Sequence, residues 1–304
     1  KAILSRASAR DFFLKRNGGT SMDIWHAEVL LNERHRLAEG PVWDERKQEL
    51  HYVDIKNNIV FSLNPETGVR TELDTNQNTG CFALRENGGY ILGMASGPYL
   101  SDTDGNLERY TELLFDPMTR ANDGKCDPYG NFWCGTADIG RWTGKGKLYR
   151  FSPDGNVREI MDGLACSNGL TFRDERMWYI DSARHRIDSY RVDPETGELS
   201  DACIVAEICT PGVVPDGMTI DEDGMLWVAH WGGGFIGRYH PVTGELLAKV
   251  EVPASQSSSC CFGGSDMRTL FITSASEGKP EETEAGKIFA YTTAQLEKQQ
   301  QSLW

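Results

Sequence analysis

Short apolar runs separated by polar turns dominate the chain, and this pattern is typical of β-strands. The stretch Pro215–Trp231, PDGMTIDEDGMLWVAHW, shows the basic unit. A polar entry at Asp216-Gly217 leads into the apolar run 218–220, an acidic turn with glycine at 221–224, and a second apolar run at 225–229. The pattern predicts a loop, a strand, a hairpin turn and a second strand.

The same unit recurs along the chain. Its hairpin turns centre near Asp44, Glu86, Asp127, Asp174, Glu222 and Ser265. The intervals of about 41 to 48 residues are typical of β-propeller blades. A third strand that ends in a turn follows in several units, at Ile59–Leu63, Lys147–Phe151, Ile187–Val192 and Ile236–Tyr239, and a more variable fourth strand comes next, as at Leu246–Val252. The sequence therefore predicts an all-β, six-bladed β-propeller with four antiparallel strands per blade around a central channel.

The two ends of the chain differ from the repeats. Residues 1–22 carry five basic residues against the single acid Asp11, and we interpret them as an expression leader with Met22 as the native start; a transit segment is the alternative. Residues 23–304 are predicted to form one propeller domain. The stretch Ile24–Leu31 is expected to complete the last blade, and Thr293–Gln301 to form a short helical piece.

Several aromatic and polar residues keep the phase of the repeat. We expect core packing for Trp43, Trp133, Trp178 and Trp227. The ends of the second strands carry Asp54, Asp181 and His230. For these three we expect hydrogen bonds to turns, with contacts lining the channel mouth as the alternative.

Charge and cysteine usage narrow the classes of partner. The net charge of −14 argues against nucleic acid or an anionic membrane surface. It indicates either a solvated surface or a negative field that attracts cations. No apolar run reaches the roughly 18 residues of a membrane span. The eight cysteines lack CxxC and zinc-type spacing, and no apolar signal segment precedes them, which indicates reduced thiols in a cytoplasmic protein.

Oxygen-bearing side chains stand just before the predicted inner strands, where a propeller brings them to one mouth of its channel. The residues at this place are Glu39, Asn168 and Asp216 in three units, Asn122 and Asp123 in a fourth, and Thr79 in the second unit. Carboxylate and amide oxygens without cysteine or paired histidine suit a hard divalent cation such as Ca²⁺, Mg²⁺ or Mn²⁺. Ordinary Asx turns and glycine-dependent strand entries are the alternative explanation.

Several ordered motifs also carry a family resemblance. They are AEGPVWD, TRANDGKCDPYGNFWCGT (119–136), SNGLTF, PDGMTIDEDGMLWVA and CCFGGSDMRTLFITSA (260–275). Together they resemble the SMP-30/gluconolactonase/LRE family, which includes regucalcin and bacterial sugar lactonases, and the last segment is most similar to the bacterial aldonolactonase branch. The similarity extends from about Glu28 to Tyr291.

This resemblance implies one divalent metal ion held by Glu39, Asn168 and Asp216. Calcium is favoured, with Mn²⁺, Mg²⁺, Zn²⁺ and Fe²⁺ as alternatives. The family's sugar-contacting Arg-x-Asn pair falls on Arg120 and Asn122, and Asp123 lies beside them. The acidic pair that many members carry after the GTM segment is absent from Gly135–Gly140, where Asp138, Arg141 or Trp142 could substitute. Trp142 and Trp231 are expected either to wall the mouth or to pack.

The implied function is metal-dependent hydrolysis of a sugar lactone. The metal would polarise the lactone carbonyl, Asp216 would take a proton from the attacking water, and Arg120 and Asn122 would orient the sugar. Metal-bound hydroxide is the alternative nucleophile. Hydrolysis of another ester class, such as phosphotriesters, and a non-catalytic calcium-binding role are the competing hypotheses. No GxSxG or phosphate-binding loop supports other chemistry.

Overall fold

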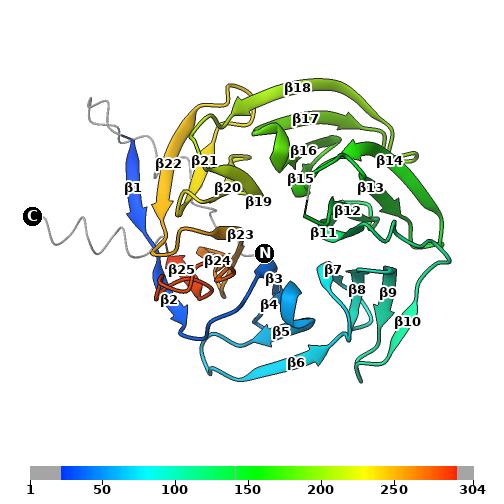
Figure 1. Cartoon of the computed structure of the whole chain (residues 1–304), viewed down its shortest axis with the longest axis horizontal. Helices are drawn as coiled ribbons and strands as arrows, with labels where there is room; N and C mark the ends of the chain where they lie inside the picture. Colours follow the sequence, from blue (N-terminus) through cyan, green and yellow to red (C-terminus); the bar gives the residue numbers. More distant parts are fainter. Residues whose placement is uncertain (1–21, 141, 293–304) are drawn as a thin grey trace, which may run out of the picture.

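Six β-sheets stand in a ring, and the chain visits them in order around it (Figure 1). The structure is a computed structural model that describes residues 22–140 and 142–292. In every sheet the strand nearest the centre of the ring begins a run of consecutive strands that leads outwards, and neighbouring inner strands contact one another around the whole ring. The predicted all-β, six-bladed propeller is therefore confirmed.

Each blade is built on four antiparallel strands in sequence order, apart from the last strand of blade six, which comes from the start of the chain; blade five carries an additional, parallel strand at its outer edge. Blade one contains β3 (Ala38–Asp44), β4 (Glu49–Asp54), β5 (Ile59–Leu63) and β6 (Arg70–Asp74). Blade two contains β7 (Thr79–Leu84), β8 (Tyr90–Met94), β9 (Gly97–Ser101) and β10 (Leu107–Arg109). Blade three contains β11 (Thr119–Cys126), β12 (Phe132–Asp138), β13 (Gly146–Phe151) and β14 (Val157–Leu164). Blade four contains β15 (Ser167–Arg173), β16 (Arg176–Asp181), β17 (Arg186–Val192) and β18 (Leu199–Glu207). Blade five contains β19 (Val214–Ile220), β20 (Leu226–Trp231), β21 (Phe235–Tyr239) and β22 (Leu246–Glu251). Blade six contains β23 (Ser257–Gly263), β24 (Thr269–Ser274), β25 (Ile288–Thr292) and β2 (Glu28–Leu31).

Two single-turn 3₁₀ helices follow the second strands of blades one and four. They are η1 (Ile55–Asn57) and η2 (Ser182–Arg184). The predicted third strands agree with β5, β13, β17 and β21 to within one residue. The helical piece expected at Thr293–Gln301 lies outside the described residues.

The start of the chain corrects one prediction. The stretch expected to form a single closing strand, Ile24–Leu31, is divided between two blades. β1 (Asp23–His26) pairs in parallel with β22 and gives blade five a fifth strand, whereas β2 pairs antiparallel with β25 and completes blade six. The division occurs at Ala27, which is buried and whose backbone N–H donates to Glu251 O at 2.9 Å.

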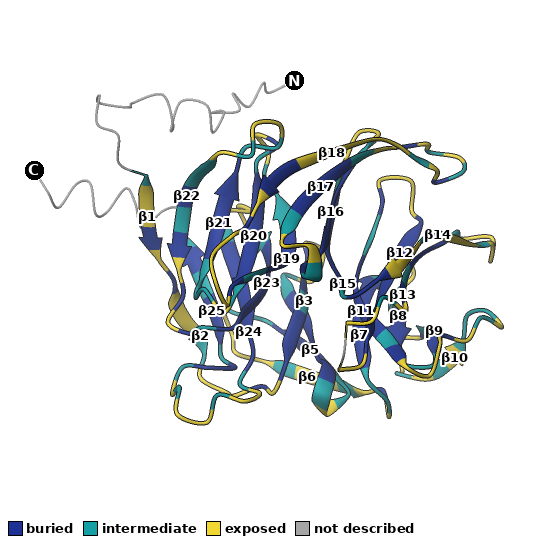
Figure 2. Cartoon of the chain, turned by 45° about the horizontal axis from the view of Figure 1, so that its top comes forward, coloured by how far each residue is buried: buried dark blue, intermediate teal, exposed yellow. Residues whose placement is uncertain are grey.

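Hydrophobic side chains from neighbouring blades pack together between the sheets. One such cluster joins Trp227 of blade five to Ile272 and Phe289 of blade six, and Trp25 of β1 belongs to it. Trp25 stacks on Trp227 and on Tyr291, with ring centroids 6.2 and 5.5 Å apart. Figure 2 shows the consequence: inner and middle strands are largely buried, and exposed residues collect on loops and outer strands such as β18.

The tryptophans confirm the expected packing, and two of them belong to a repeated blade motif. In blade five, Asp221 Oδ2 accepts hydrogen bonds from Trp227 Nε1 at 2.9 Å and from Arg238 Nε at 2.8 Å. In blade three, Asp127 Oδ2 accepts from Trp133 Nε1 at 2.9 Å and lies 3.7 Å from Arg150 Nε. The remaining pair packs differently, since Trp178 donates to Pro241 O and half-buried Trp43 stacks on Phe271.

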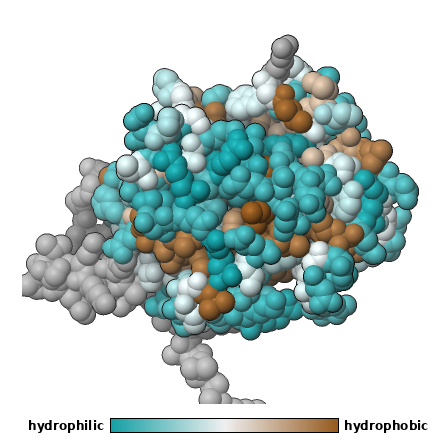
Figure 3. All heavy atoms as spheres, turned by 60° about the horizontal axis from the view of Figure 1, so that its bottom comes forward, coloured by the Kyte–Doolittle hydropathy of each residue, from teal (hydrophilic) through white to brown (hydrophobic). Residues whose placement is uncertain are grey.

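The surface is mostly hydrophilic where Figure 3 displays it, with hydrophobic side chains in small separate groups. Within the described residues, no helix is both long enough and apolar enough to cross a bilayer. All eight cysteines are unpaired; Cys81, Cys134, Cys260 and Cys261 are buried, whereas Cys203 and Cys209 are exposed.

Candidate metal and sugar site

A β-bulge interrupts the inner strand of every blade at one end of the ring, and the predicted site residues lie at or beside these bulges. The pairing register shifts between Glu39 and Val42, Thr79 and Cys81, Ala121 and Gly124, Asn168 and Leu170, Pro215 and Met218, and Ser257 and Ser259. The predicted residues therefore lie inside the strands and not before them: Glu39, Asn168 and Asp216 come one or two residues after the first ladder pair, and Asn122 and Asp123 come three and four residues after it. A bulge re-aims the side chains next to it, which suits a site built at the mouth of a channel.

Close packing of the inner strands explains why glycine follows several of these residues. A Cβ on Gly169, next to Asn168, would lie 2.4 Å from Asp216 O of blade five. A Cβ on Gly80 would lie 2.1 Å from Ala121 O of blade three. Such distances exclude any side chain at these two positions, and Gly217 is equally close to Ser259 of blade six. Gly40, after Glu39, differs: it has open space around it and a positive φ of 51°.

Aspartates at the ends of the second strands hold the segments that enter the inner strands. Asp54 accepts hydrogen bonds from the backbone N–H groups of Arg36 and Leu37, at 2.9 and 3.1 Å. Asp181 does the same for Ala165 and Cys166, at 3.2 and 3.0 Å. The expected hydrogen bonds to turns are confirmed for these two residues.

His230 shares their position in the repeat but faces the interior of its blade. Its Nδ1 lies 3.0 Å from Val228 O and its Nε2 lies 2.8 Å from the Tyr239 hydroxyl. The expected turn role is wrong for His230. A neutral imidazole suits this place, and burial lowers its pKa to about 4.

Three carboxylates from three blades meet at the site. Glu39, Asp123 and Asp216 are only 7%, 7% and 5% exposed. Burial raises the pKa of Glu39 well above its usual value, and the charges of Asp216 and Asp123 raise it further. Burial and Asp123 likewise raise the pKa of Asp216, against the opposing effect of the Asn168 amide. Burial also raises the pKa of Asp123, which Lys125 partly offsets.

Two buried oxygen atoms at this site have no hydrogen-bond partner. They are Asn168 Oδ1 and Asp216 Oδ1. Buried polar atoms are almost always paired, so an orphaned amide oxygen beside repelling carboxylates indicates a place for a cation. Across residues 22–140 and 142–292, no three His, Cys, Asp or Glu side chains form a metal-ligand group by themselves. A metal here would therefore need the amide oxygen of Asn168 beside Glu39 and Asp216, an all-oxygen set that fits a hard divalent cation.

Arg120 and Asn122 stand next to the carboxylates on β11. Arg120 is partly exposed, its Nη1 donates to Ala121 O at 2.8 Å, and its charge lowers the pKa values of Glu39 and Asp216. Asn122 Nδ2 donates to Ser167 O of blade four at 2.8 Å. The structure thus brings all five predicted metal and sugar residues, together with Asp123, to one place.

Cys166 and Ser182 also belong to this place, although the sequence analysis did not find them. Cys166 Sγ lies 3.8 Å from Asn122 Nδ2 and 3.9 Å from Asn168 Nδ2. Burial, followed by the charge of Asp216, raises the pKa of the Cys166 thiol to about 12, so it stays protonated at neutral pH. Ser182 Oγ accepts a hydrogen bond from Asn168 Nδ2 at 3.0 Å. The position of Cys166 two residues before Asn168 was a signal in the sequence, but nothing there showed its contacts.

Asp138, Trp142 and Trp231, which could replace the missing acidic pair or wall the mouth, have other surroundings than the three buried carboxylates. The Asp138 carboxylate accepts hydrogen bonds from the backbone N–H of Thr143, at 2.7 Å, and from the Thr143 hydroxyl, and the hydroxyl contact is the main cause of its lowered pKa. Trp142 is exposed, with a positive φ of 48°. Trp231 is half-buried against a cluster that includes Leu37. Arg141 lies outside the described residues.

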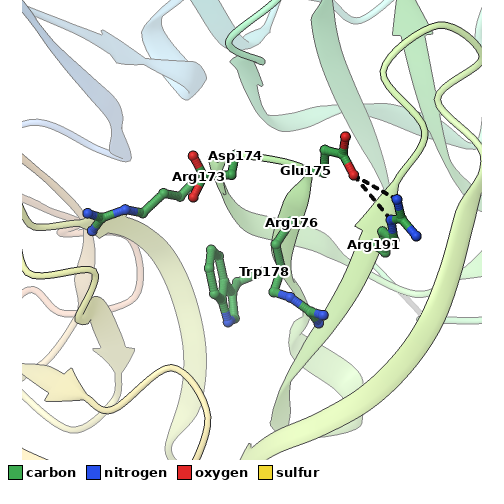
Figure 4. Close-up of a pocket in the computed structure, with 6 residues that line it drawn as sticks. All are labelled: Arg173, Asp174, Glu175, Arg176, Trp178 and Arg191. Atoms are coloured by element: carbon green, nitrogen blue, oxygen red, sulfur yellow. Dashed lines mark hydrogen bonds and ion pairs between the residues drawn. The ribbon is translucent and has the colours of Figure 1, made fainter.

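A separate hollow of about 320 Å³ lies at the opposite end of blade four (Figure 4). It is lined by Arg173, Asp174, Glu175, Arg176, Trp178 and Arg191, which surround the β15–β16 turn. Glu175 pairs with Arg191 across it at 2.9 Å. None of the predicted site residues lines this hollow, and its exposed ion pairs give it no chemistry comparable to the buried carboxylates.

Comparison with known proteins adds to this geometry. A family model described as SMP-30/Gluconolactonase/LRE-like region matches residues 37–276. The chain is 36% identical to regucalcin of Danio rerio over 277 residues, 87% of this chain and 93% of the relative. It is 36% identical to 6-deoxy-6-sulfogluconolactonase of Pseudomonas putida over 251 residues, 81% and 86% of the two chains. The crystal structure of a calcium-binding protein, regucalcin, from Agrobacterium tumefaciens superposes with a TM-score of 0.83 at 25% identity, over 89% of this chain and 95% of that one.

Proposed function

Because the chain belongs to the SMP-30/gluconolactonase/LRE-like family, we propose that it hydrolyses a sugar lactone, of the aldonolactone class, to the aldonic acid with the help of one divalent metal ion. The single observation that carries the proposal is the buried set of Glu39, Asn168 and Asp216, with two oxygens that lack partners. Relatives named as a sulfogluconolactonase and a calcium-binding regucalcin support the substrate class and the kind of ion.

Glu39, Asn168 and Asp216 would hold the metal, and their all-oxygen set suits Ca²⁺, Mg²⁺ and Mn²⁺ better than Zn²⁺ or Fe²⁺. Ca²⁺ is favoured among them because a relative is named as a calcium-binding regucalcin. When bound, the cation supplies Lewis-acid polarisation of the lactone carbonyl. Glu39 and Asp216 contribute the negative charge that attracts the ion into a partly dry site.

Asp216 is the residue we assign to proton transfer. Its carboxylate would accept a proton from the water that attacks the carbonyl carbon. It would return that proton to the ring oxygen, which leaves as a hydroxyl group when its bond to the carbonyl carbon breaks. Burial and the nearby Asp123 raise the pKa of Asp216. A raised pKa makes a carboxylate a better base at neutral pH, and it offsets part of the lowering that a bound cation causes.

Arg120, Asn122 and Asp123 would bind the sugar. The partly exposed Arg120 guanidinium can donate to hydroxyl groups, and Asp123 can accept from them. Holding the substrate in one orientation lowers the entropic part of the barrier without any bond chemistry from these residues.

The test is proton release from a panel of five- and six-membered aldonolactones. The protein is stripped of metal and reloaded with Ca²⁺, Mn²⁺, Mg²⁺, Zn²⁺ or Fe²⁺. We expect turnover that requires metal and that falls by roughly 100-fold or more in Asp216→Asn, while Asp154→Asn, in an exposed turn, stays at the wild-type rate. Metal binding without turnover would favour the calcium-binding role, and turnover of a phosphotriester in place of every lactone would favour the other ester class.

A further inference from the structure

Ser182 occupies a position between the two blades that supply Asn168 and Asp216. It is the first residue of η2, directly after Asp181, and its side chain is almost fully buried. Its hydroxyl contacts the Asn168 amide at 3.0 Å and the carbonyl oxygen of Pro215, the residue before Asp216, at 2.7 Å. We propose that Ser182 is a positioning residue that turns the amide oxygen of Asn168 toward the metal; this inference rests on the proposed function.

The direction of these hydrogen bonds fixes the orientation of the amide. A backbone carbonyl can only accept, so the Ser182 hydroxyl donates to Pro215 O. The hydroxyl then has only lone pairs to offer to Asn168, and the amide must present its N–H group. Cys166 Sγ lies near the same nitrogen, at 3.9 Å, as a weak second acceptor. With its nitrogen held in this way, Asn168 keeps Oδ1 without a protein partner.

A comparison within the ring separates this role from a local structural one. In blade one, the position of Ser182 in η1 is occupied by Ile55, which has no hydroxyl. The backbone contacts are the same, since Ile55 N donates to Leu37 O and Ser182 N donates to Cys166 O, both at 3.0 Å. The 3₁₀ turn therefore forms without a hydroxyl. Blade one supplies Glu39, a carboxylate with two equivalent oxygens, and needs no device to orient an amide.

The experiment compares Ser182→Ala with the control Ser189→Ala, which removes another buried, hydrogen-bonded serine of blade four, distant in the sheet from the bulge. Calorimetric titration of the metal-free proteins with Ca²⁺ and with Mn²⁺ measures affinity, and thermal unfolding of the same samples measures stability. Loss of a residue that orients a metal ligand typically lowers affinity about 10- to 100-fold. We expect that loss of affinity in Ser182→Ala only, although both metal-free variants lose a buried hydroxyl and should melt at lower temperatures than the wild type.

Ser182→Cys is the second variant in case alanine prevents folding. Its thiol has nearly the same size but accepts a hydrogen bond weakly, so we expect an intermediate affinity. Wild-type affinity in either folded Ser182 variant, or an equal loss of affinity in Ser189→Ala, would overturn the positioning role while leaving the proposed function intact. A wild-type protein that binds neither ion would overturn the metal-dependent function itself, and the positioning role with it.

Discussion

Glu39 illustrates the electrostatic conflict at the site when no cation is present. Its carboxylate is buried close to two others, and both burial and their charges raise its pKa. A group whose pKa is higher in the folded state favours folding while it is protonated. It loses that contribution as the pH rises from the unfolded value, about 4.3, through the folded one.

The neutral variant Glu39→Gln should therefore stabilise the metal-free protein at pH 7, by about 1–2 kcal/mol, since it removes one buried charge. The same variant should abolish the rise in melting temperature that Ca²⁺ gives the wild type. Differential scanning calorimetry with and without Ca²⁺ measures both effects. Glu66→Gln, in an exposed turn, is the control, and a lower stability of metal-free Glu39→Gln would contradict the repulsion argument.

Gly169→Ala should disturb the site through packing alone. Its Cβ would lie 2.4 Å from Asp216 O, so β15 and β19 must move apart. We expect a loss of about 1–3 kcal/mol in stability together with weaker metal binding. Urea unfolding measures the loss of stability, and calorimetric titration measures the weaker metal binding. Gly233→Ala, whose Cβ would meet only side-chain atoms at 3.0 Å or more, should show a smaller loss in stability.

At the scale of the blade, the repeated turn aspartate ties three strands together. Asp127 accepts hydrogen bonds from the backbone and side chain of Asn131 and from Trp133, and it faces Arg150. Removing one partner of such a buried set leaves the others unsatisfied, which is more destabilising than the pair itself is stabilising.

Asp127→Ala should lower the free energy of unfolding by about 3 kcal/mol. Urea titration followed by tryptophan fluorescence measures the change, because unfolding exposes the fully buried Trp133 to water. Asp154→Ala changes an aspartate in an exposed turn later in blade three, and it should lower the free energy of unfolding by less than about 0.5 kcal/mol. Equal losses in the two variants would show that the buried network contributes nothing special.

The elements themselves were largely predictable, because alternating apolar residues and glycine turns recur at one interval. The in-phase positions of Glu39, Asn168 and Asp216 followed from the same repeat. The bulges did not, since the inner strands are buried on both faces where the bulges lie and so lack the apolar-polar alternation whose phase one extra residue would shift. Cys166 and Ser182 could not be found because their contacts join different strands and blades. The division of Ile24–Leu31 depends on the edges that β22 and β25 leave open, which no local pattern records.

For the whole molecule, buried histidines determine how the free energy of unfolding changes as the pH falls. Burial lowers the pKa values of His51 and His230 to about 4, and it lowers that of His35 as well. A histidine with a lowered folded pKa contributes stability that is present above its unfolded value, near 6.5, and is lost as the pH falls toward 4.

His230→Gln should therefore reduce the pH dependence of stability between pH 6.5 and 4 by about one proton, or about 1.4 kcal/mol per pH unit. Urea unfolding at a series of pH values gives this slope, whatever the absolute stability of the variant. His240→Gln, at a half-buried position in the turn between β21 and β22, is the control. An unchanged slope in His230→Gln would mean that this imidazole is charged in the folded protein.

The divided N-terminal strand also governs when the ring can close during synthesis. β2 and β25 are paired, so one of the first strands to leave the ribosome waits for the last described one. Blades one to four and the four consecutive strands of blade five can assemble from contacts between sequence neighbours. The fourth strand of blade six requires a contact across some 260 residues, the slow kind of event in folding, and the pairing of β1 with β22 is also long-range. Until then β2 has no β25 edge to pair with, and β23 and β24 form an incomplete sheet. The growing chain would be most exposed to wrong partners in that interval, and molecular chaperones would have most to protect there.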